Sequence, residues 1–284
     1  MLYRFIACFC LWITPLICFG EAPPTVLVSI APYKLFVERI AGETVTVMLM
    51  VPAGASAHTY EPTPRQMLAA SNADFWFRLG ESFETRAIAA LKAHNPKMDV
   101  VDLRQGVEMI TVDPMSGHCC CCHADCQDTH IWLSARQAKI QVNTIAEALI
   151  KRYPQNAERY RKALNALIQE LDELDKQISA ILQPLKQRTI LVSHPAYAYF
   201  CRDYDLKQLS IEFEGKDPTP QQMNSIFTKA REAGLKRVFI QMQYNSKGAR
   251  LFAQELGGKV VILDPYSEHY FKSMLEIAKQ FAQN

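Results

Sequence analysis

Residues 157–182 contain neither glycine nor proline, and this stretch limits the possible folds more than any other part of the chain. Its apolar side chains recur at spacings of three and four residues, which predicts an amphipathic helix. These side chains are Leu164, Leu167, Ile168, Leu171, Leu174, Ile178 and Ile181. A helix from about Pro154 to Gln183 would be roughly 45 Å long. A coiled coil is the alternative, but the apolar seam is short for one, and we expect a rigid helix that joins two lobes.

Short β-branched runs alternate with helical patterns on both sides of this helix, which is typical of an α/β fold with parallel sheets. The expected strands are Thr25–Ile30, Thr44–Val51, Asp74–Leu79 and Met98–Leu103 in the first lobe, and Thr189–His194, Gln208–Phe213, Arg237–Met242 and Lys259–Leu263 in the second. Pro64–Ala70 and Pro220–Ala233 are expected helices. The expected domains are an amino-terminal lobe over residues 21–150, a linker helix over 151–184 and a carboxy-terminal lobe over 185–284.

The first 20 residues are expected to be a signal peptide. Arg4 gives a basic start, residues 5–19 are apolar apart from Thr14 and Pro15, and Gly20 precedes a suitable cleavage region. A membrane anchor is the alternative, but the apolar run is short and contains Pro15. We therefore expect export to the periplasm, which is an oxidising compartment.

The overall charge excludes one class of function. Lys and Arg number 31 and Asp and Glu 29, so the formal net charge is +2. A strongly basic surface for nucleic acid is therefore not expected. With 49% hydrophobic and 21% charged residues, the composition is that of a globular protein, and we expect it to be a monomer.

The nine cysteines cluster instead of spreading along the chain, as those of a disulfide scaffold would. Five of them lie in the loop over residues 113–128, which contains no Lys or Arg. A secondary metal site in this loop would use His118, Cys119, Cys122, His123 and Cys126. An inert loop with oxidised thiols is the alternative. A thiol redox protein is disfavoured, because reactive cysteines usually need positively charged surroundings.

Three histidines and one aspartate lie where strands end or helices begin. His58 follows one expected strand, His194 ends another, and Asp264 comes directly after the last. His130 lies just before a helix for which Ser134 is the expected cap. Because ligands bind outside the carboxyl ends of strands in open α/β sheets, these four side chains would meet in the cleft between the lobes. Neutral imidazoles with one carboxylate suit zinc, whereas hard cations prefer oxygen ligands.

Five motifs around these residues occur in order along the chain. They are His58-Thr-Tyr-Glu-Pro-Thr-Pro64, Thr129-His-Ile-Trp-Leu133, Ser193-His194 with Tyr199-Phe200, Glu214-Gly-Lys-Asp-Pro-Thr-Pro220 and Leu263-Asp-Pro265. The chain after the signal peptide thereby resembles the solute-binding proteins of zinc and manganese ABC importers, of the zinc-uptake type. The resemblance implies two lobes joined by one long helix.

The resemblance also implies a ligand set. His58, His130 and His194 match the three histidine ligands of the zinc-uptake members, and Asp264 matches a fourth, carboxylate ligand. Glu61 lies where some members place an acidic residue near the metal, and it ranks below Asp264.

The implied function is a periplasmic carrier that delivers Zn²⁺ to the membrane permease of an ABC importer. Manganese and iron members tend to have a carboxylate in place of His194, so zinc is favoured, and a carrier of Mn²⁺ or Fe²⁺ is the alternative. A zinc hydrolase is a further alternative. It is disfavoured because the sequence has no HExxH motif, Asp264 would fill the open coordination position, and Glu61 is the one candidate base. We expect no enzymatic activity.

Overall fold

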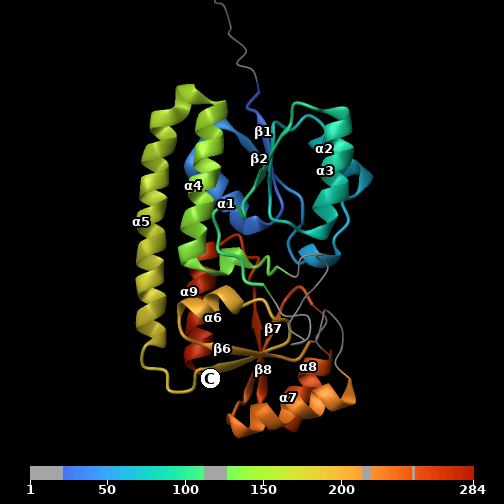
Figure 1. Cartoon of the computed structure of the whole chain (residues 1–284), viewed down its shortest axis with the longest axis vertical. Helices are drawn as coiled ribbons and strands as arrows, with labels where there is room; N and C mark the ends of the chain where they lie inside the picture. Colours follow the sequence, from blue (N-terminus) through green and yellow to red (C-terminus); the bar gives the residue numbers. More distant parts are fainter. Residues whose placement is uncertain (1–21, 112–126, 213–218, 245–246) are drawn as a thin grey trace, which may run out of the picture.

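Each of the two lobes of the molecule contains one sheet of four parallel strands (Figure 1). The structure is a computed structural model, which describes residues 22–111, 127–212, 219–244 and 247–284. The first sheet, in the order β2-β1-β3-β4, contains β1 (Thr25–Val28), β2 (Thr46–Leu49), β3 (Phe75–Arg78) and β4 (Asp99–Asp102). The second sheet, in the order β6-β5-β7-β8, contains β5 (Thr189–Val192), β6 (Lys207–Ser210), β7 (Arg237–Gln241) and β8 (Lys259–Leu263). The predicted α/β fold class is therefore confirmed.

All eight expected strands are present, although most are shorter than predicted. Strand β2 shows why the observed strands are shorter than the expected ones. Beyond its last residue, Leu49, the amides of Met50 and Val51 still donate to the carbonyl oxygens of Val28 and Ser29, at 2.9 and 3.1 Å. The apolar run thus continues the backbone ladder for a short distance after the regular strand pairing ends. The carboxyl ends of both sheets point toward the junction of the lobes.

Helices cover both faces of each sheet. The first lobe contains α1 (Ala31–Ala41), α2 (Pro64–Ala70), α3 (Ser82–His94) and α4 (Ala135–Arg152), and the second contains α6 (Ala198–Asp203), α7 (Pro220–Glu232), α8 (Lys247–Glu255) and α9 (Tyr270–Ala282). Helices α2 and α7 begin alike, with proline at the first position and a threonine cap (Thr63 or Thr219) in a capping box with the glutamine three residues later. Both helices begin where the sequence predicted, at Pro64 and Pro220.

The long helix α5 (Ala157–Leu182) runs along one side of the molecule beside both lobes (Figure 1). It is 26 residues long and shorter than expected, because Pro154–Asn156 forms a separate 3-10 turn. Its buried side chains are Tyr160, Leu164, Leu167, Leu171, Leu174, Ile178 and Leu182. They face α1 and α4 of the first lobe and α9 of the second. The helix is thus packed against both lobes and belongs to the hydrophobic core.

The lobes share one hydrophobic core, which extends from the first sheet through α1, α4, α5 and α9 to one face of the second sheet. Trp132 lies at the junction and is fully buried. Its indole Nε1 donates to the carbonyl oxygen of Pro265 at 2.8 Å, and its own carbonyl oxygen accepts from the Tyr270 hydroxyl at 2.8 Å. A smaller cluster beneath α7 and α8 packs on the other face of the second sheet.

Two predicted features fall outside the described residues. One is the signal peptide over residues 1–20, and the other is the secondary metal site at His118, Cys119, Cys122, His123 and Cys126. Among the helices in the described ranges, none is long and apolar enough to cross a membrane.

The packing of α5 predicts a strong dependence of stability on its buried face. Replacing Leu171, which is fully buried, by alanine is expected to lower the free energy of unfolding by about 2–5 kcal/mol, because it removes apolar contacts and leaves a cavity. Gln169→Ala, on the exposed face of the same helix, is the matched control and should change it by less than about 0.5 kcal/mol. Urea unfolding of the metal-free protein measures both. Equal stability of the two variants would contradict the packing of α5.

Candidate metal centre

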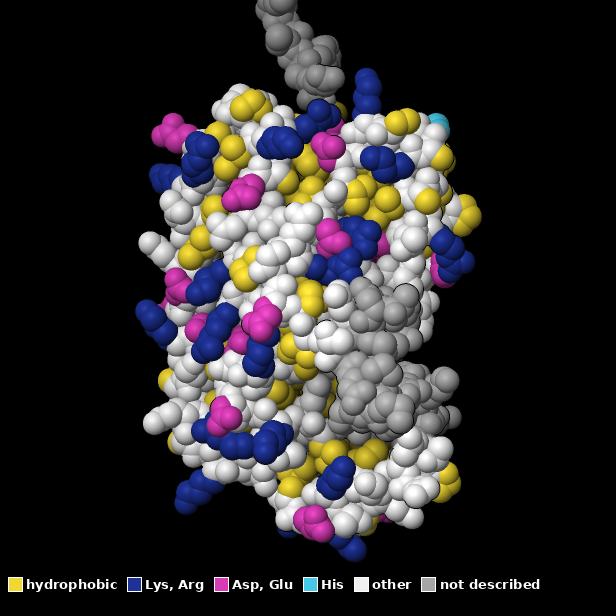
Figure 2. Space-filling model, viewed as in Figure 1, with side chains coloured by type: hydrophobic (Ala, Val, Ile, Leu, Met, Phe, Trp, Pro, Cys, Tyr) yellow, Lys and Arg dark blue, Asp and Glu magenta, His cyan; other side chains and the backbone are white. Residues whose placement is uncertain are grey.

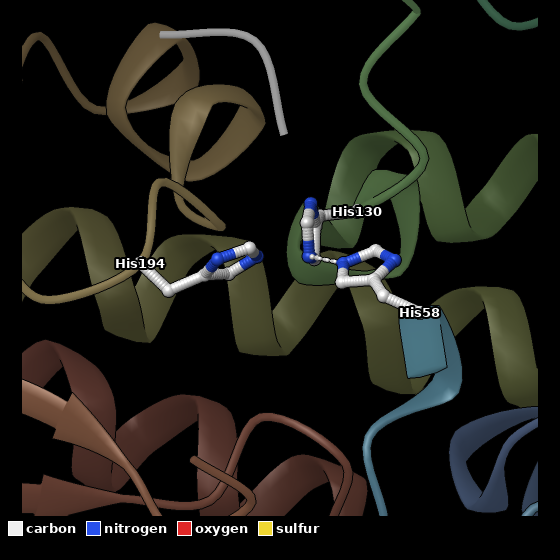
Figure 3. Close-up of side chains that lie close together, drawn as sticks. All are labelled: His58, His130 and His194. Atoms are coloured by element: carbon white, nitrogen blue, oxygen red, sulfur yellow. Dashed lines mark hydrogen bonds between the residues drawn. The ribbon is translucent and has the colours of Figure 1, made fainter. Parts of the chain in front are cut away.

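Three imidazole rings from separate segments converge at the junction of the lobes (Figure 3). His58 lies in a 3-10 turn after β2, His130 directly precedes the 3-10 turn Ile131–Leu133, and His194 follows the end of β5 by two residues. One ring nitrogen of each lies within 4.8 Å of those of the other two. The residues are 9%, 0% and 2% exposed, respectively, so the cluster is buried. The predicted convergence of these three histidines is thus present in the structure.

Each histidine is held by a carboxylate through the same ring nitrogen. Nδ1 of His58 lies 2.8 Å from Glu81, Nδ1 of His130 lies 2.7 Å from Asp128, and Nδ1 of His194 lies 2.6 Å from Glu212. A carboxylate only accepts hydrogen bonds, so each Nδ1 carries the proton and donates. In a neutral imidazole, the Nε2 atom then has a free lone pair. The three carboxylates therefore select the tautomer that presents Nε2 as a ligand.

The Nε2 atoms lack suitable partners of their own. Nε2 of His58 and Nε2 of His130 are 3.2 Å apart, and two lone pairs at this distance repel unless a proton or cation lies between them. Nε2 of His194 is buried and has no hydrogen-bond partner. A buried polar atom of this kind is costly unless something binds it. The arrangement fits a metal ion that accepts three nitrogen ligands.

Local backbone structure places the carboxylate beside His58. Glu81 precedes α3 and also accepts a hydrogen bond from Thr129 Oγ1 at 3.0 Å, next to His130. Before it, Gly80 has a φ of +105°, and a Cβ there would lie 2.9 Å from the Arg104 guanidinium. The buried Glu84 carboxyl accepts from the amides of Leu79 and Gly80 at 2.8 and 2.6 Å, which holds this turn in place.

Burial and the neighbouring charges shift the pKa values of two of these histidines in opposite directions. Burial lowers the pKa of His194 to about 4, with a further contribution from the nearby His130 and His58, and the hydrogen bond to Glu212 opposes this only in part. Burial also disfavours charge on His58, but the Glu81 carboxylate outweighs it, so the pKa of His58 is raised above its usual 6.5. His194 is therefore neutral at pH 7, whereas His58 takes up a proton more readily than an ordinary histidine.

Asp264 and Glu61 are the other two predicted ligands in the described ranges. Neither belongs to the group of three histidines. Asp264 follows β8, and its Oδ1 accepts from Gln243 Nε2 at 2.6 Å and from the Tyr266 amide at 3.2 Å. Glu61 forms an ion pair with Arg86, and its side chain is 61% exposed. A role of either residue as a ligand stays a prediction.

The sequence analysis missed the three carboxylates that hold the imidazoles. Asp128 lies two residues before His130, Glu81 follows β3, and Glu212 follows β6. For Glu81 and Glu212, the signal was the rule that indicated His58 and His194, since residues just after parallel strands lie at the same edge of the sheet. Sequence alone does not reveal which acid pairs with which histidine.

Comparison with known proteins places this arrangement in a family. Residues 26–284 match the family model of the periplasmic component A of the zinc-uptake complex. The chain belongs to this family. Family members are solute-binding proteins of metal ABC importers, which is a transport family and not an enzyme class, so the resemblance inferred from the sequence motifs is confirmed. The family is also periplasmic, whereas the signal peptide stays a prediction.

Individual relatives extend the similarity over most of the chain. A protein of Chlamydia muridarum, named as a candidate metal-binding protein, is 36% identical over 267 residues, which cover 93% of each chain. The crystal structure of a ZnuA is 36% identical, with a TM-score of 0.85 over 92% of this chain and 98% of that one. A ZnuA deletion mutant with zinc bound gives a TM-score of 0.84 at 36% identity, over 92% of this chain and 97% of that one.

The pKa shifts predict two distinct titrations in the metal-free protein. His194 should stay neutral down to about pH 4 because it is buried, and His58 should take up its proton above pH 6.5 because of Glu81. Both should carry the Nδ1 proton when neutral. Two-bond ¹H–¹⁵N correlation spectra of the imidazoles measure protonation and tautomer together, with the urea-unfolded protein as the reference. Titration of both rings near 6.5, or an Nε2 proton on His194, would contradict this description of the site.

Proposed function

We propose that this protein captures a zinc ion with Nε2 of His58, His130 and His194, and delivers it to the membrane permease of an ABC importer. The observation that carries the proposal is the convergence of three buried Nε2 atoms, each oriented by a carboxylate on the opposite side of its ring. Family membership supports the transport role, and the relative with zinc bound supports the choice of ion.

The donor atoms favour zinc over manganese or iron. Zinc binds imidazole nitrogen at about 2.0–2.1 Å and accepts four ligands in a tetrahedron. Manganese prefers oxygen, and the carboxylates nearest the imidazoles, those of Glu81, Asp128 and Glu212, are already engaged with Nδ1 atoms. The fourth position would be filled by Asp264, Glu61 or water. Asp264 is the preferred protein ligand, and its Oδ1 atom accepts a hydrogen bond from Gln243.

Burial of the site favours a carrier over a zinc hydrolase. A hydrolase needs an open coordination position that a substrate can reach and a general base beside it. Here the three histidines are at most 9% exposed. The candidate base, Glu61, is engaged with Arg86 on the surface. A closed site of this kind is suited to holding an ion and not to turning over a substrate.

The charges on one face of the molecule do not favour the binding of nucleic acid. On the face shown in Figure 2, Lys and Arg side chains are interspersed with Asp and Glu. Such mixing does not produce the continuous positive field that a nucleic acid requires. We propose that the chain acts as a monomer, with the permease as its macromolecular partner.

The proposal predicts a loss of zinc affinity that is confined to the site. His130→Ala removes a fully buried ligand and should weaken zinc binding by at least about tenfold, since one coordinate bond is lost. His269→Ala is the matched control, because His269 is an exposed histidine before α9 and should leave the affinity unchanged. Competition with a chelator of known affinity measures both constants. Oxidising buffer suppresses any contribution from the cysteine-rich loop, whose secondary site would need reduced thiols.

The same competition experiment tests the effect of pH. Zinc affinity should fall as the pH is lowered through the raised pKa of His58, because the proton then occupies a ligand. Normal zinc binding by His130→Ala, or by a variant that lacks both His58 and His130, would overturn the proposed function.

A further inference from the structure

The segment that carries His130 is hydrogen-bonded to helix α6 of the second lobe on both sides of the histidine. Before it, the Tyr199 hydroxyl donates to the carbonyl oxygen of Asp128 at 2.9 Å. After it, the Ser134 hydroxyl donates to the carboxylate of Asp203. Tyr199 and Asp203 both belong to α6. A helix of the second lobe thus holds the segment from which the first lobe presents this imidazole.

The Tyr199 hydroxyl bonds to two neighbouring backbone segments of the first lobe. It donates to Asp128, and it accepts from the amide of Ile110 at 3.0 Å. Met109 Sδ lies 3.7 Å from the hydroxyl, but the hydroxyl has a single proton, and the Asp128 carbonyl oxygen is the nearer and stronger acceptor. Ile110 and Asp128 are also paired with each other, since the Asp128 amide donates to the carbonyl oxygen of Ile110 at 2.9 Å. Tyr199 is fully buried, and its hydroxyl therefore fixes the backbone at Asp128.

The Asp128 side chain connects this backbone position to the imidazole of His130. Its Oδ1 accepts from the His130 amide at 2.8 Å and from the His130 Nδ1 at 2.7 Å. Both bonds go to one buried carboxylate oxygen, so the direction of the ring depends on where the Asp128 backbone lies. A metal site whose supporting residues are displaced by about 1 Å binds its ion less well.

We infer that Tyr199 is a positioning residue for His130. Its hydroxyl holds the backbone of Asp128, and Asp128 in turn holds the imidazole. The inference rests on the proposed function, since it takes His130 as a metal ligand. Because α6 begins four residues after His194, the second lobe supplies one ligand and positions another that belongs to the first lobe. Zinc then binds more tightly, because His130 needs little further ordering when the ion arrives.

Competition with a chelator in oxidising buffer tests this role. Tyr199→Phe removes the hydroxyl and keeps the buried ring. The zinc dissociation constant should rise about two- to tenfold, as expected for the net effect of a neutral hydrogen bond. Tyr204→Phe is the matched control, since it removes a hydroxyl at the end of the same helix that donates to Asp175 on α5 at 2.8 Å. It should leave the dissociation constant unchanged.

A double variant separates an effect through Asp128 from a general effect on the fold. In Asp128→Ala, the carbonyl oxygen that accepts from Tyr199 remains, but the carboxylate that holds His130 is absent. Adding Tyr199→Phe to this variant should therefore cause no further loss of zinc affinity. If Tyr199 acted by any other route, the losses caused by the two substitutions would be additive.

The imidazole proton on Nδ1 of His130 provides a second measurement, which needs no metal. In Tyr199→Phe its NMR resonance should move upfield, because its hydrogen bond to Asp128 weakens, while those of His58 and His194 stay in place. An unchanged dissociation constant in Tyr199→Phe, additive losses in the double variant, or equal shifts of all three resonances would overturn the role of Tyr199 while the proposed function stands. Failure of the unaltered protein to bind zinc tightly would instead overturn the proposed function, and this role with it.

Discussion

The hydrogen bonds between three carboxylates and three imidazoles are the constraint on which the candidate site depends. Burying an uncompensated polar ring is costly, and each ring here has one nitrogen satisfied by an acidic partner. The same bond fixes the ring orientation and leaves the second nitrogen facing the centre. The carboxylates lie just behind the rings, so they also favour a cation in front of them. Without these partners, the three histidines would have neither a defined tautomer nor a fixed direction.

The fold supplies this arrangement by placing strand ends from both lobes at one junction. His58 follows β2 and His194 follows β5, while His130 lies in the segment next to Trp132. Because Trp132 is hydrogen-bonded to the second lobe at Pro265 and Tyr270, the segment that carries His130 is anchored to both lobes. The packing of α5 along α1, α4 and α9 keeps the lobes together on the other side.

Local patterns in the sequence predicted most of the fold, and a general rule about strand ends predicted two of the three histidines. The apolar spacing predicted α5, and a proline at the first turn indicated the start of α7. The rule that ligands lie at the carboxyl ends of parallel strands singled out His58 and His194. Two of the pairings between imidazole and acid were beyond prediction, because Glu81 and Glu212 are 23 and 18 residues from their partners and only the tertiary fold brings them together. The packing of α5 against both lobes and the hydrogen bond from Tyr199 to Asp128 are likewise long-range contacts, which have no signal in a local pattern.

The most direct test of three inward-facing Nε2 ligands is X-ray absorption at the zinc edge on the protein loaded with one equivalent of zinc. We predict three imidazole ligands at about 2.0–2.1 Å, together with a fourth light-atom ligand, and two imidazoles in the His194→Ala variant. A coordination shell dominated by sulfur at about 2.3 Å would contradict the account, because the cysteine-rich loop would then hold the ion. The same number of imidazoles in the protein and in His194→Ala would contradict it as well.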